Sequence, residues 1–274
     1  MTQEREPEPG VAAADSAASL ALRFQRDGFL ALRSLFTPSE VHDIVGRLDE
    51  FLVTVLEHIP PEHVFFENRE DPASLKQIQL LHQHAPFIDD LACQGKLPKL
   101  AATLLGEACE IQNVQLFRKA PGHGRATPPH QDGEYFKLDP PQAVTLWLAL
   151  DPTDSRNGCL RYVRGSHCEG LRPHTRGQTL GFSQRLTDWT SQDVQREVAI
   201  PAGPGDLIAH HAMTIHRADG NRHGPIRRAL GFIYYGHSAR EDEDARRQAR
   251  DVTYSRWRAE GRIPPSEPKN PPSH

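Results

Sequence analysis

The sequence predicts a mainly β protein, an all-β barrel or jelly roll with helices flanking it. From residue 109 onward, short β-like runs follow one another and are separated by Gly, Pro and Asp. Many short strands with such turn signals are typical of barrels and jelly rolls. Helical patterns occupy the chain before that point. A length of 274 residues with 37% hydrophobic content is enough for one sizeable core.

The N-terminal part begins with a polar segment and leads into a helix. Residues 1–14 are rich in Glu, Pro and Ala, and we expect a disordered tail there. A short helix is predicted over about 16–27, ended by Gly28. The segment 29–36 (FLALRSLF) then alternates loosely between apolar and polar residues, which predicts a strand.

The clearest helix of the chain follows. The segment 37–40 (TPSE) is a capping box with Pro at the first helical position. Apolar residues continue at helical spacing and predict a stripe that packs in the core; they are Val41, Ile44, Val45, Leu48, Phe51, Leu52 and Val55. Residues 59–75 are irregular and contain Pro, so we expect a loop or lid. A second apolar pattern predicts a helix over 97–105, stopped by Gly106.

The β-like runs make up most of the remaining chain. They read EIQNVQLFRK, QAVTLWLALD, CLRYVRG, REVAIPA, DLIAHHA and RRALGFIYYG. The segment 239–258 is highly charged and predicts a solvated helix rather than an interface. Residues 259–274 are Pro-rich and polar, and a disordered tail is expected there. We therefore expect a single domain over 15–258.

Composition argues against several classes of protein. The net charge is −4, so no basic surface for nucleic acid is expected. No run approaches the roughly 18 apolar residues that span a bilayer, so no membrane partner is expected. The start, MTQEREPEPG, lacks the pattern of a signal peptide, which favours a cytoplasmic location. The cysteines show no CxxC spacing and are expected to be free thiols; they are Cys93, Cys109, Cys159 and Cys168.

A histidine and an aspartate lie two residues apart in the segment 130–136 (HQDGEYF). On a strand, His130 and Asp132 would point to the same face. Such a pair could bind a metal, form a proton relay or be an ordinary surface pair. A third ligand elsewhere in the chain would decide for a metal.

The segment 205–217 (GDLIAHHAMTIHR) offers three candidates for that third ligand, His210, His211 and His216. Two histidines and one carboxylate form a facial triad, which leaves three positions of the metal open. This arrangement is typical of non-haem Fe(II), although a zinc hydrolase could use the same ligands.

An arginine shortly after this segment is a candidate for binding a carboxylate. The planar guanidinium of Arg227 could hold the distal carboxylate of a 2-oxo acid through two parallel hydrogen bonds. The alternative is that Arg227 or its neighbour Arg228 is a surface residue.

Four ordered blocks give the chain a family resemblance over roughly residues 22–237. They are FQRDGFLALRSLFTPSEV, RKAPG followed by PPHQDGEYF, VTLWLALDPTDSRNGCLRYVRGSH, and PGDLIAHHAMTIHRADGNRHGPIRRAL. On these blocks the chain resembles the phytanoyl-CoA dioxygenase (PhyH) family of Fe(II)- and 2-oxoglutarate-dependent oxygenases. The resemblance implies a double-stranded β-helix, a cupin-like jelly roll.

The resemblance also implies the metal and catalytic residues. The family triad falls on His130, Asp132 and His216, which selects His216 among the three histidines. The family arginine for 2-oxoglutarate falls on Arg227 rather than Arg228.

Further contacts to 2-oxoglutarate are implied at Lys76, Gln115 and Trp147. Each has a plain alternative, since Lys76 could be solvated, Gln115 could pair with the barrel backbone and Trp147 could be core. The chain departs from the family where it has Lys119-Ala120-Pro121 instead of KPP, and Arg161 instead of Pro. These departures leave the triad intact.

The implied activity is hydroxylation of an unactivated C–H bond of a small molecule. Fe(II), 2-oxoglutarate and O2 would take part, with ascorbate as a possible accessory, and succinate and CO2 would be released. Related halogenating enzymes have Ala or Gly in place of the carboxylate ligand, so Asp132 favours oxygenation. The rival interpretations are a metal-dependent hydrolase or isomerase and a non-enzymatic sensor.

The sequence does not identify the substrate. Tyr135 and Phe136 are expected to line the pocket, and segments 59–75 and 170–187 are expected to close over it. Arginines and a histidine within the second segment would suit an anionic group, although an ordinary polar loop is favoured. Nothing in the sequence indicates coenzyme A, and a monomer and a dimer both stay open.

Overall fold

The computed structural model describes residues 16–68, 70–179, 182–222 and 224–261. The predicted N-terminal tail, 1–14, lies outside the described residues, as does the predicted C-terminal tail beyond residue 261. No helix among the described residues is long and apolar enough to cross a membrane.

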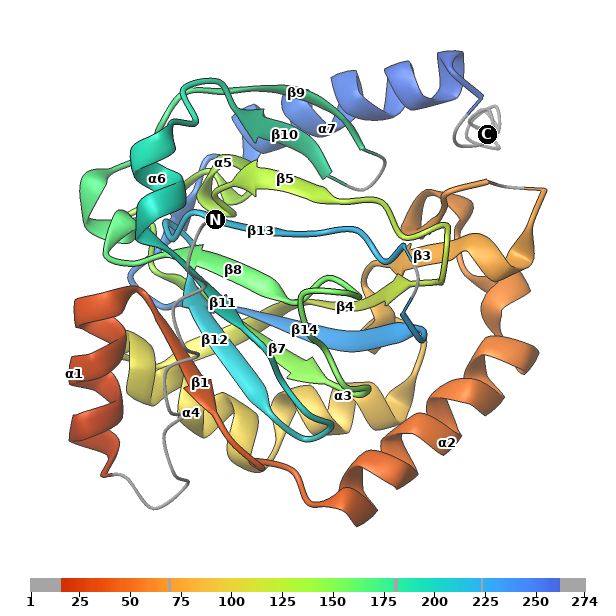
Figure 1. The fold of residues 1–274 in the computed structure, drawn as a ribbon, viewed down its shortest axis with the longest axis horizontal. Coiled ribbons are helices and arrows are strands. Elements are labelled where there is room, and N and C mark those ends of the chain that lie inside the picture. Colours follow the sequence, from red (N-terminus) through yellow and green to blue (C-terminus); the bar gives the residue numbers. More distant parts are fainter. Residues whose placement is uncertain (1–15, 69, 180–181, 223, 262–274) are drawn as a thin grey trace, which may run out of the picture.

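Two antiparallel sheets face each other and form the body of the molecule (Figure 1). The large sheet has the order β1 (Phe29–Leu32), β12 (Leu207–His211), β7 (Ala143–Ala149), β14 (Arg227–Gly236), β4 (Cys109–Lys119), β3 (Leu75–Ile78) and β2 (Val64–Phe66). The small sheet has the order β11 (Glu197–Ile200), β8 (Leu160–Val163), β13 (His216–Ala218) and β5 (Thr127–His130). The predicted fold class, a jelly roll with flanking helices, is confirmed.

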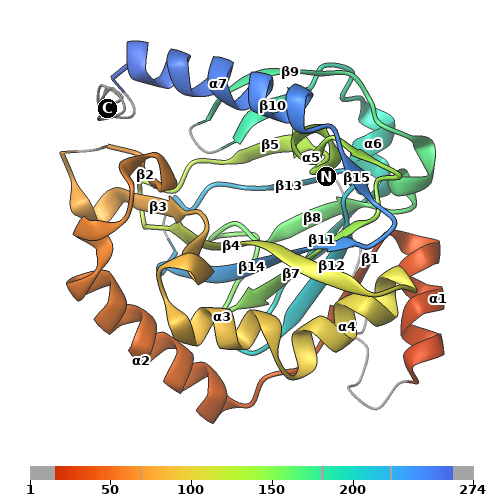
Figure 2. The ribbon, with the colours of Figure 1, turned by 180° about the vertical axis from the view of Figure 1, so that it is seen from behind.

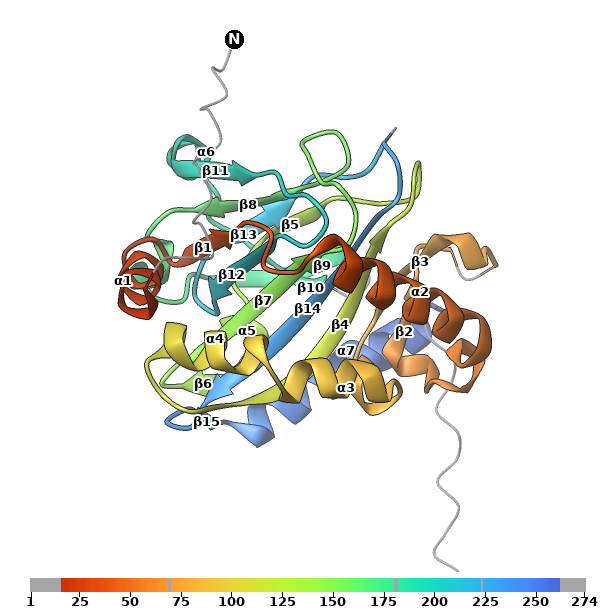
Figure 3. The ribbon, with the colours of Figure 1, turned by 90° about the horizontal axis from the view of Figure 1, so that it is seen from below.

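Helices cover the outer face of the large sheet (Figure 3). They are α2 (Pro38–Thr54), α3 (Pro86–Cys93) and α4 (Lys96–Leu105), with α1 (Ala17–Asp27) packed against α4. The other helices are the short α5 (Gly133–Phe136) and α6 (Ser191–Arg196), and α7 (Glu243–Ala259). Two small two-stranded sheets complete the fold: the hairpin of β9 (His174–Thr179) with β10 (Phe182–Leu186), and the pair of β6 (Leu138–Asp139) with the distant β15 (Arg240–Glu241). Helix α7 lies across the molecule from α2, α3 and α4 (Figures 1 and 2).

Strand β7 shows how the two layers of core arise. Its side chains alternate, so that Leu146 and Leu148 belong to the cluster under the helices. Trp147 and Ala149 belong to the cluster between the two sheets. Every residue of β7 is buried because both faces are covered, which explains the nearly continuous apolar run in its sequence.

The elements at the N-terminus follow the sequence signals closely. The α2 capping box is present, with Thr37 and Glu40 each accepting a backbone N–H of the other. Strand β1 is shorter than predicted and ends at Leu32. The cause is Asp206, whose carboxylate accepts the Ser34 N–H at 2.8 Å and the Arg33 guanidinium at 2.7 Å, and so turns the chain away from the sheet.

Two segments differ from the prediction. The segment 59–75 is not irregular, because it carries β2 at the edge of the large sheet together with 3-10 turns. The segment 170–187 contains the β9–β10 hairpin. Movement of either segment over the pocket stays a prediction.

Helix α7 is more than a solvated helix. Its Trp257 is 4% exposed and packs edge-on against Phe65 of β2, with the ring centroids 5.4 Å apart. Tyr254 stacks on the same indole. The sequence could not indicate this contact, because only two aromatic residues of a highly charged helix make it.

Candidate metal centre and active site

Three side chains converge at one point, two from the small sheet and one from the turn that follows it. His130 ends β5 and His216 begins β13, and the two lie directly opposite each other in neighbouring strands. Asp132 Oδ1 lies 3.7 Å from His130 Nε2 and 3.8 Å from His216 Nε2. One ligand atom from each residue lies within 4.8 Å of the others. This spacing suits a metal ion, whose bonds to such atoms are about 2.0–2.2 Å long.

Asp132 reaches this point by a route that differs from the prediction. Strand β5 ends at His130, and Asp132 has helical backbone angles (φ −60°, ψ −30°) at the start of α5. The expected shared strand face is therefore wrong, and a turn brings the carboxylate back to the histidines. Gly133 leaves room for Met213, whose Sδ would lie 2.7 Å from a Cβ at this position.

Hydrogen bonds fix the orientation of both imidazoles. His130 Nδ1 donates to the Pro128 carbonyl at 2.8 Å, and His216 Nδ1 donates to the Thr214 carbonyl at 3.0 Å. Because each Nδ1 carries the proton, each Nε2 presents a lone pair to the gap. Burial lowers the pKa of both histidines, so both rings are neutral near pH 7. Neutral imidazoles are good metal ligands.

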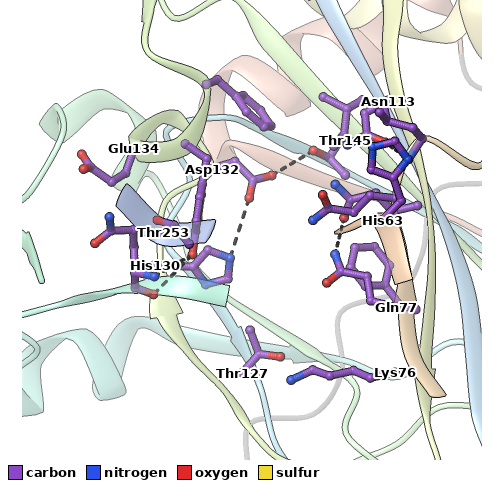
Figure 4. Close-up of a pocket in the computed structure, with 18 of the residues that line it drawn as sticks. His63, Lys76, Gln77, Asn113, Thr127, His130, Asp132, Glu134, Thr145 and Thr253 are labelled. Carbon is purple, nitrogen blue, oxygen red and sulfur yellow. Dashed lines mark hydrogen bonds and ion pairs between the residues drawn. The ribbon is translucent and has the colours of Figure 1, made fainter. Parts of the chain in front are cut away.

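The carboxylate of Asp132 is held on its other oxygen. Oδ2 accepts the Thr145 hydroxyl at 2.9 Å (Figure 4) and lies 3.2 Å from His210 Nε2. Burial raises the pKa of Asp132, but the nearby His216 and His210 imidazoles lower it more, so the carboxyl is ionised. Two neutral imidazoles and one ionised carboxylate are a donor set that fits Fe(II).

A pocket with a volume of about 570 Å³ opens in front of these residues. Tyr135 and Phe136 line it, as the sequence predicted. His210, one of the three candidates for the third ligand, also lines the pocket. The pocket further includes side chains that the sequence did not single out, among them Thr145 at the metal centre and Tyr254 and Trp257 from α7. No local pattern indicated Tyr254 or Trp257, because α7 meets the pocket only through tertiary packing.

Arg227 lies in the same pocket, and Arg228 does not. Arg227 is 3% exposed, and its guanidinium lies 5.3 Å from the centre of the Trp147 ring. Its Nη2 donates to the Gly158 carbonyl at 3.2 Å, whereas its Nε has no hydrogen-bond partner among the described residues. Burial lowers the pKa of Arg227 to about 10, which still leaves it cationic at neutral pH.

Arg228 points the other way along β14. It forms a bidentate pair with Asp151, with both contacts at 2.9 Å, and reaches Asp49 at 3.0 Å. Its charge is therefore already neutralised outside the pocket.

The three further candidates for 2-oxoglutarate also line the pocket. Lys76 is 7% exposed and forms an ion pair with Glu67 at 3.2 Å, so it is not solvated. Gln115 accepts a hydrogen bond from the Gln77 amide at 2.7 Å. Trp147 packs between the sheets while it borders the pocket. Their contacts to 2-oxoglutarate stay predictions.

Two of the polar residues of segment 170–187 have structural partners. Arg172 pairs with Asp193 at 2.7 Å and with Asp188 at 3.0 Å. His174 Nε2 accepts the Gln131 N–H at 3.1 Å. Both are engaged in the protein itself, in line with the favoured interpretation of an ordinary polar loop.

Comparison with known proteins identifies the family. The model of the phytanoyl-CoA dioxygenase (PhyH) family matches residues 24–229. The chain belongs to this family. Membership confirms the enzyme class predicted from the sequence, a non-haem iron 2-oxoglutarate-dependent dioxygenase, and with it Fe(II) and 2-oxoglutarate as cofactor and co-substrate.

Curated relatives of this PhyH-family chain include enzymes with different names. It is 29% identical over 244 residues to a phytanoyl-CoA dioxygenase of Arabidopsis thaliana, covering 76% of this chain and 85% of that protein. It is 26% identical over 214 residues to a probable alpha-ketoglutarate-dependent hypophosphite dioxygenase of Stutzerimonas stutzeri, covering 76% and 74%.

Solved structures share the fold at lower identity. EctD from S. alaskensis with 2-oxoglutarate and 5-hydroxyectoine has a TM-score of 0.69 at 21% identity, covering 85% of this chain and 81% of that one. The carbocyclase SnoK from nogalamycin biosynthesis has a TM-score of 0.68 at 20% identity, covering 97% of each chain. The PhyH-family fold therefore occurs in enzymes whose named reactions differ.

Proposed function

We propose that this chain hydroxylates an unactivated C–H bond of a small molecule, using Fe(II), 2-oxoglutarate and O2 and releasing succinate and CO2. The observation that supports this most directly is that the triad and Arg227 line one pocket. A hydrolase or isomerase would need the metal, but it would not need a buried arginine with an unpartnered Nε. One catalytic domain over 15–258 carries the activity.

The proposed metal ligands are the Nε2 atoms of His130 and His216 and Oδ1 of Asp132. Bound iron supplies the oxidising chemistry for the C–H bond, together with 2-oxoglutarate and O2. The three residues would hold the ion from one side and leave its other side to the pocket that they line. The protein's part is to hold these atoms in place and to exclude water.

The proposed site for 2-oxoglutarate extends from the metal centre to Arg227. Arg227 binds the distal carboxylate, and Trp147 forms the wall beside its guanidinium. Lys76 and Gln115 contribute from β3 and β4. A buried guanidinium in a pocket of low dielectric favours a carboxylate partner strongly.

The substrate is proposed to be a small molecule that enters between α7 and the metal centre. Tyr135, Tyr254 and Trp257 give this part of the pocket aromatic walls. The names of the relatives mention compounds as different as phytanoyl-CoA and hypophosphite, so none of these compounds is assigned here. A cytoplasmic location is proposed because all four cysteines are free thiols.

The test is release of succinate from 2-oxoglutarate by the purified chain with Fe(II), stimulated by compounds from metabolite pools. We expect one Fe(II) per chain, and we expect Asp132→Ala and His216→Ala each to abolish turnover while circular dichroism shows an intact fold. Full oxygenase activity in either variant would contradict the ligand assignment. Substrate turnover without consumption of 2-oxoglutarate would favour the hydrolase or isomerase.

A further inference from the structure

The two oxygens of Asp132 have different surroundings. Oδ1 faces the Nε2 atoms of His130 and His216 at 3.7 and 3.8 Å. Oδ2 faces away from them and contacts the Thr145 hydroxyl at 2.9 Å and His210 Nε2 at 3.2 Å. Oδ1 therefore faces the proposed metal position, and Oδ2 faces Thr145 and His210.

The direction of these hydrogen bonds follows from the chemistry of the groups. An ionised carboxylate only accepts, so Thr145 and His210 Nε2 must both donate to it. The Tyr162 hydroxyl lies 3.0 Å from His210 Nδ1 and forms a hydrogen bond with this second nitrogen of the ring. His210 is 2% exposed and Tyr162 is fully buried, so the hydrogen bond between these two side chains lies in the protein interior.

The strands place these groups with little freedom. His210 in β12 and Thr145 in β7 are direct partners in the large sheet, so their side chains approach Asp132 from paired positions. Tyr162 in β8 is the direct partner of His216 in the small sheet. Its ring stacks on Phe29, with centroids 4.8 Å apart and planes 13° apart. The hydrogen bonds therefore join the two sheets at the metal centre.

We propose that His210, oriented by Tyr162, acts with Thr145 as a positioning pair that restricts Asp132 to ligation through Oδ1 alone. This inference rests on the proposed role of Asp132 as a metal ligand. An octahedral ion offers six positions, and the triad takes three when the carboxylate binds through one oxygen. Chelation by 2-oxoglutarate takes two more and leaves one for O2. A carboxylate bound through both oxygens would fill that last position.

The experiment uses the full chain and Co(II) as the probe, since Co(II) accepts the same ligands and its visible absorption reports coordination number. His210→Phe keeps the ring shape but removes the donor. His210→Gln keeps a donor, because its amide nitrogen takes the place of Nε2. Thr145→Val removes the second donor. The matched control is His211→Phe, a largely buried neighbour on the same strand whose ring packs near Phe24 and His167 instead.

We expect His210→Phe to weaken Co(II) binding by roughly 10- to 100-fold, as is typical when a group that orients a ligand is lost. Its Co(II) absorption should also be weaker, because the freed carboxylate raises the coordination number. Thr145→Val should likewise weaken Co(II) binding and lower the Co(II) absorption. The Co(II) affinity and absorption of His210→Gln and of His211→Phe should stay close to those of the unmodified chain. Thermal unfolding of the metal-free proteins checks that each variant is folded.

Two results would overturn the inference. One is a folded His210→Phe variant with unchanged Co(II) affinity and absorption. The other is a His210→Gln variant as impaired as His210→Phe, because the packing of the ring would then matter and its hydrogen bond would not. Asp132→Ala separates this failure from a failure of the proposed function. If Asp132→Ala binds Co(II) normally, the ligand assignment itself is wrong.

Discussion

Two adjacent arginines illustrate how much depends on a single residue position. Successive side chains of a strand point to opposite faces, so Arg227 enters the pocket and Arg228 reaches Asp151 on the other side. The two have the same chemistry and differ only in their surroundings. Of the two arginines, Arg227 is the one that lines the pocket.

We expect Arg227→Ala to weaken 2-oxoglutarate binding by about 2–4 kcal/mol, the cost of losing a buried bidentate ion pair. This corresponds to a rise of roughly 30- to 1000-fold in the dissociation constant. Anaerobic titration of the metal-loaded chain with 2-oxoglutarate measures it. Arg228→Ala is the control and should leave this constant unchanged, while it lowers stability by unpairing Asp151. The opposite pattern would mean that the arginine assignment is reversed.

At the residue scale, the sequence led to candidate ligands but not to their geometry. His130, Asp132, His216 and Arg227 could be proposed from motif order and family resemblance. The roles of Thr145 and His210 could not, because they depend on which strands pair and in which register. The expected strand position of Asp132 was wrong for a related reason. A two-residue spacing does not reveal that the strand ends at the first residue of the pair.

At the element scale, the contrast between α2 and α7 is instructive. Helix α2 carries its own signals, a capping box and a regular apolar stripe, and the sequence predicted it well. Helix α7 is charged on most of its surface, and its apolar attachment consists of Tyr254 and Trp257 against Phe65. The partner strand lies far away in the sequence, so local patterns could not predict the contact.

We expect Trp257→Ala to detach α7 while the two sheets stay folded. The reason is that Trp257 is the one residue of α7 that is fully buried among the described residues. Hydrogen exchange should become much faster in α7 and change little in β7 and β14. The exposed neighbour Val252 offers a control, since Val252→Ala removes apolar surface without removing this contact. Unchanged protection of α7 in Trp257→Ala would show that other contacts hold the helix.

At the scale of the whole molecule, the fold class was predictable and the detailed assembly was not. Short runs with turn signals indicated a jelly roll, and the family blocks indicated the double-stranded β-helix. The order of strands was not accessible, because pairs such as β1 with β12 join the two ends of the domain. Strand β13 was missed altogether, since a strand of three residues has no periodicity to detect.

The metal centre joins two of the shortest strands in the body of the molecule. His130 closes β5, with four residues, and His216 opens β13, with three. A ligand that binds only the folded state stabilises it by about 2.7 kcal/mol at a hundredfold excess over its dissociation constant. We expect excess Co(II) or Fe(II) under anaerobic conditions to raise the melting temperature and a chelator to lower it. Calorimetry of Asp132→Ala should show no such shift, and equal melting temperatures for loaded and empty native chain would contradict this prediction.

Because the proposed iron ligands lie on both strands, the stability of the protein against degradation should also depend on the supply of iron. A protease acts on molecules that have opened, and their number falls as the folded state is stabilised. Chains that acquire the ion soon after synthesis are therefore degraded more slowly than chains that do not. In a cell short of iron, the amount of this enzyme should decline along with its activity, without any change in its production.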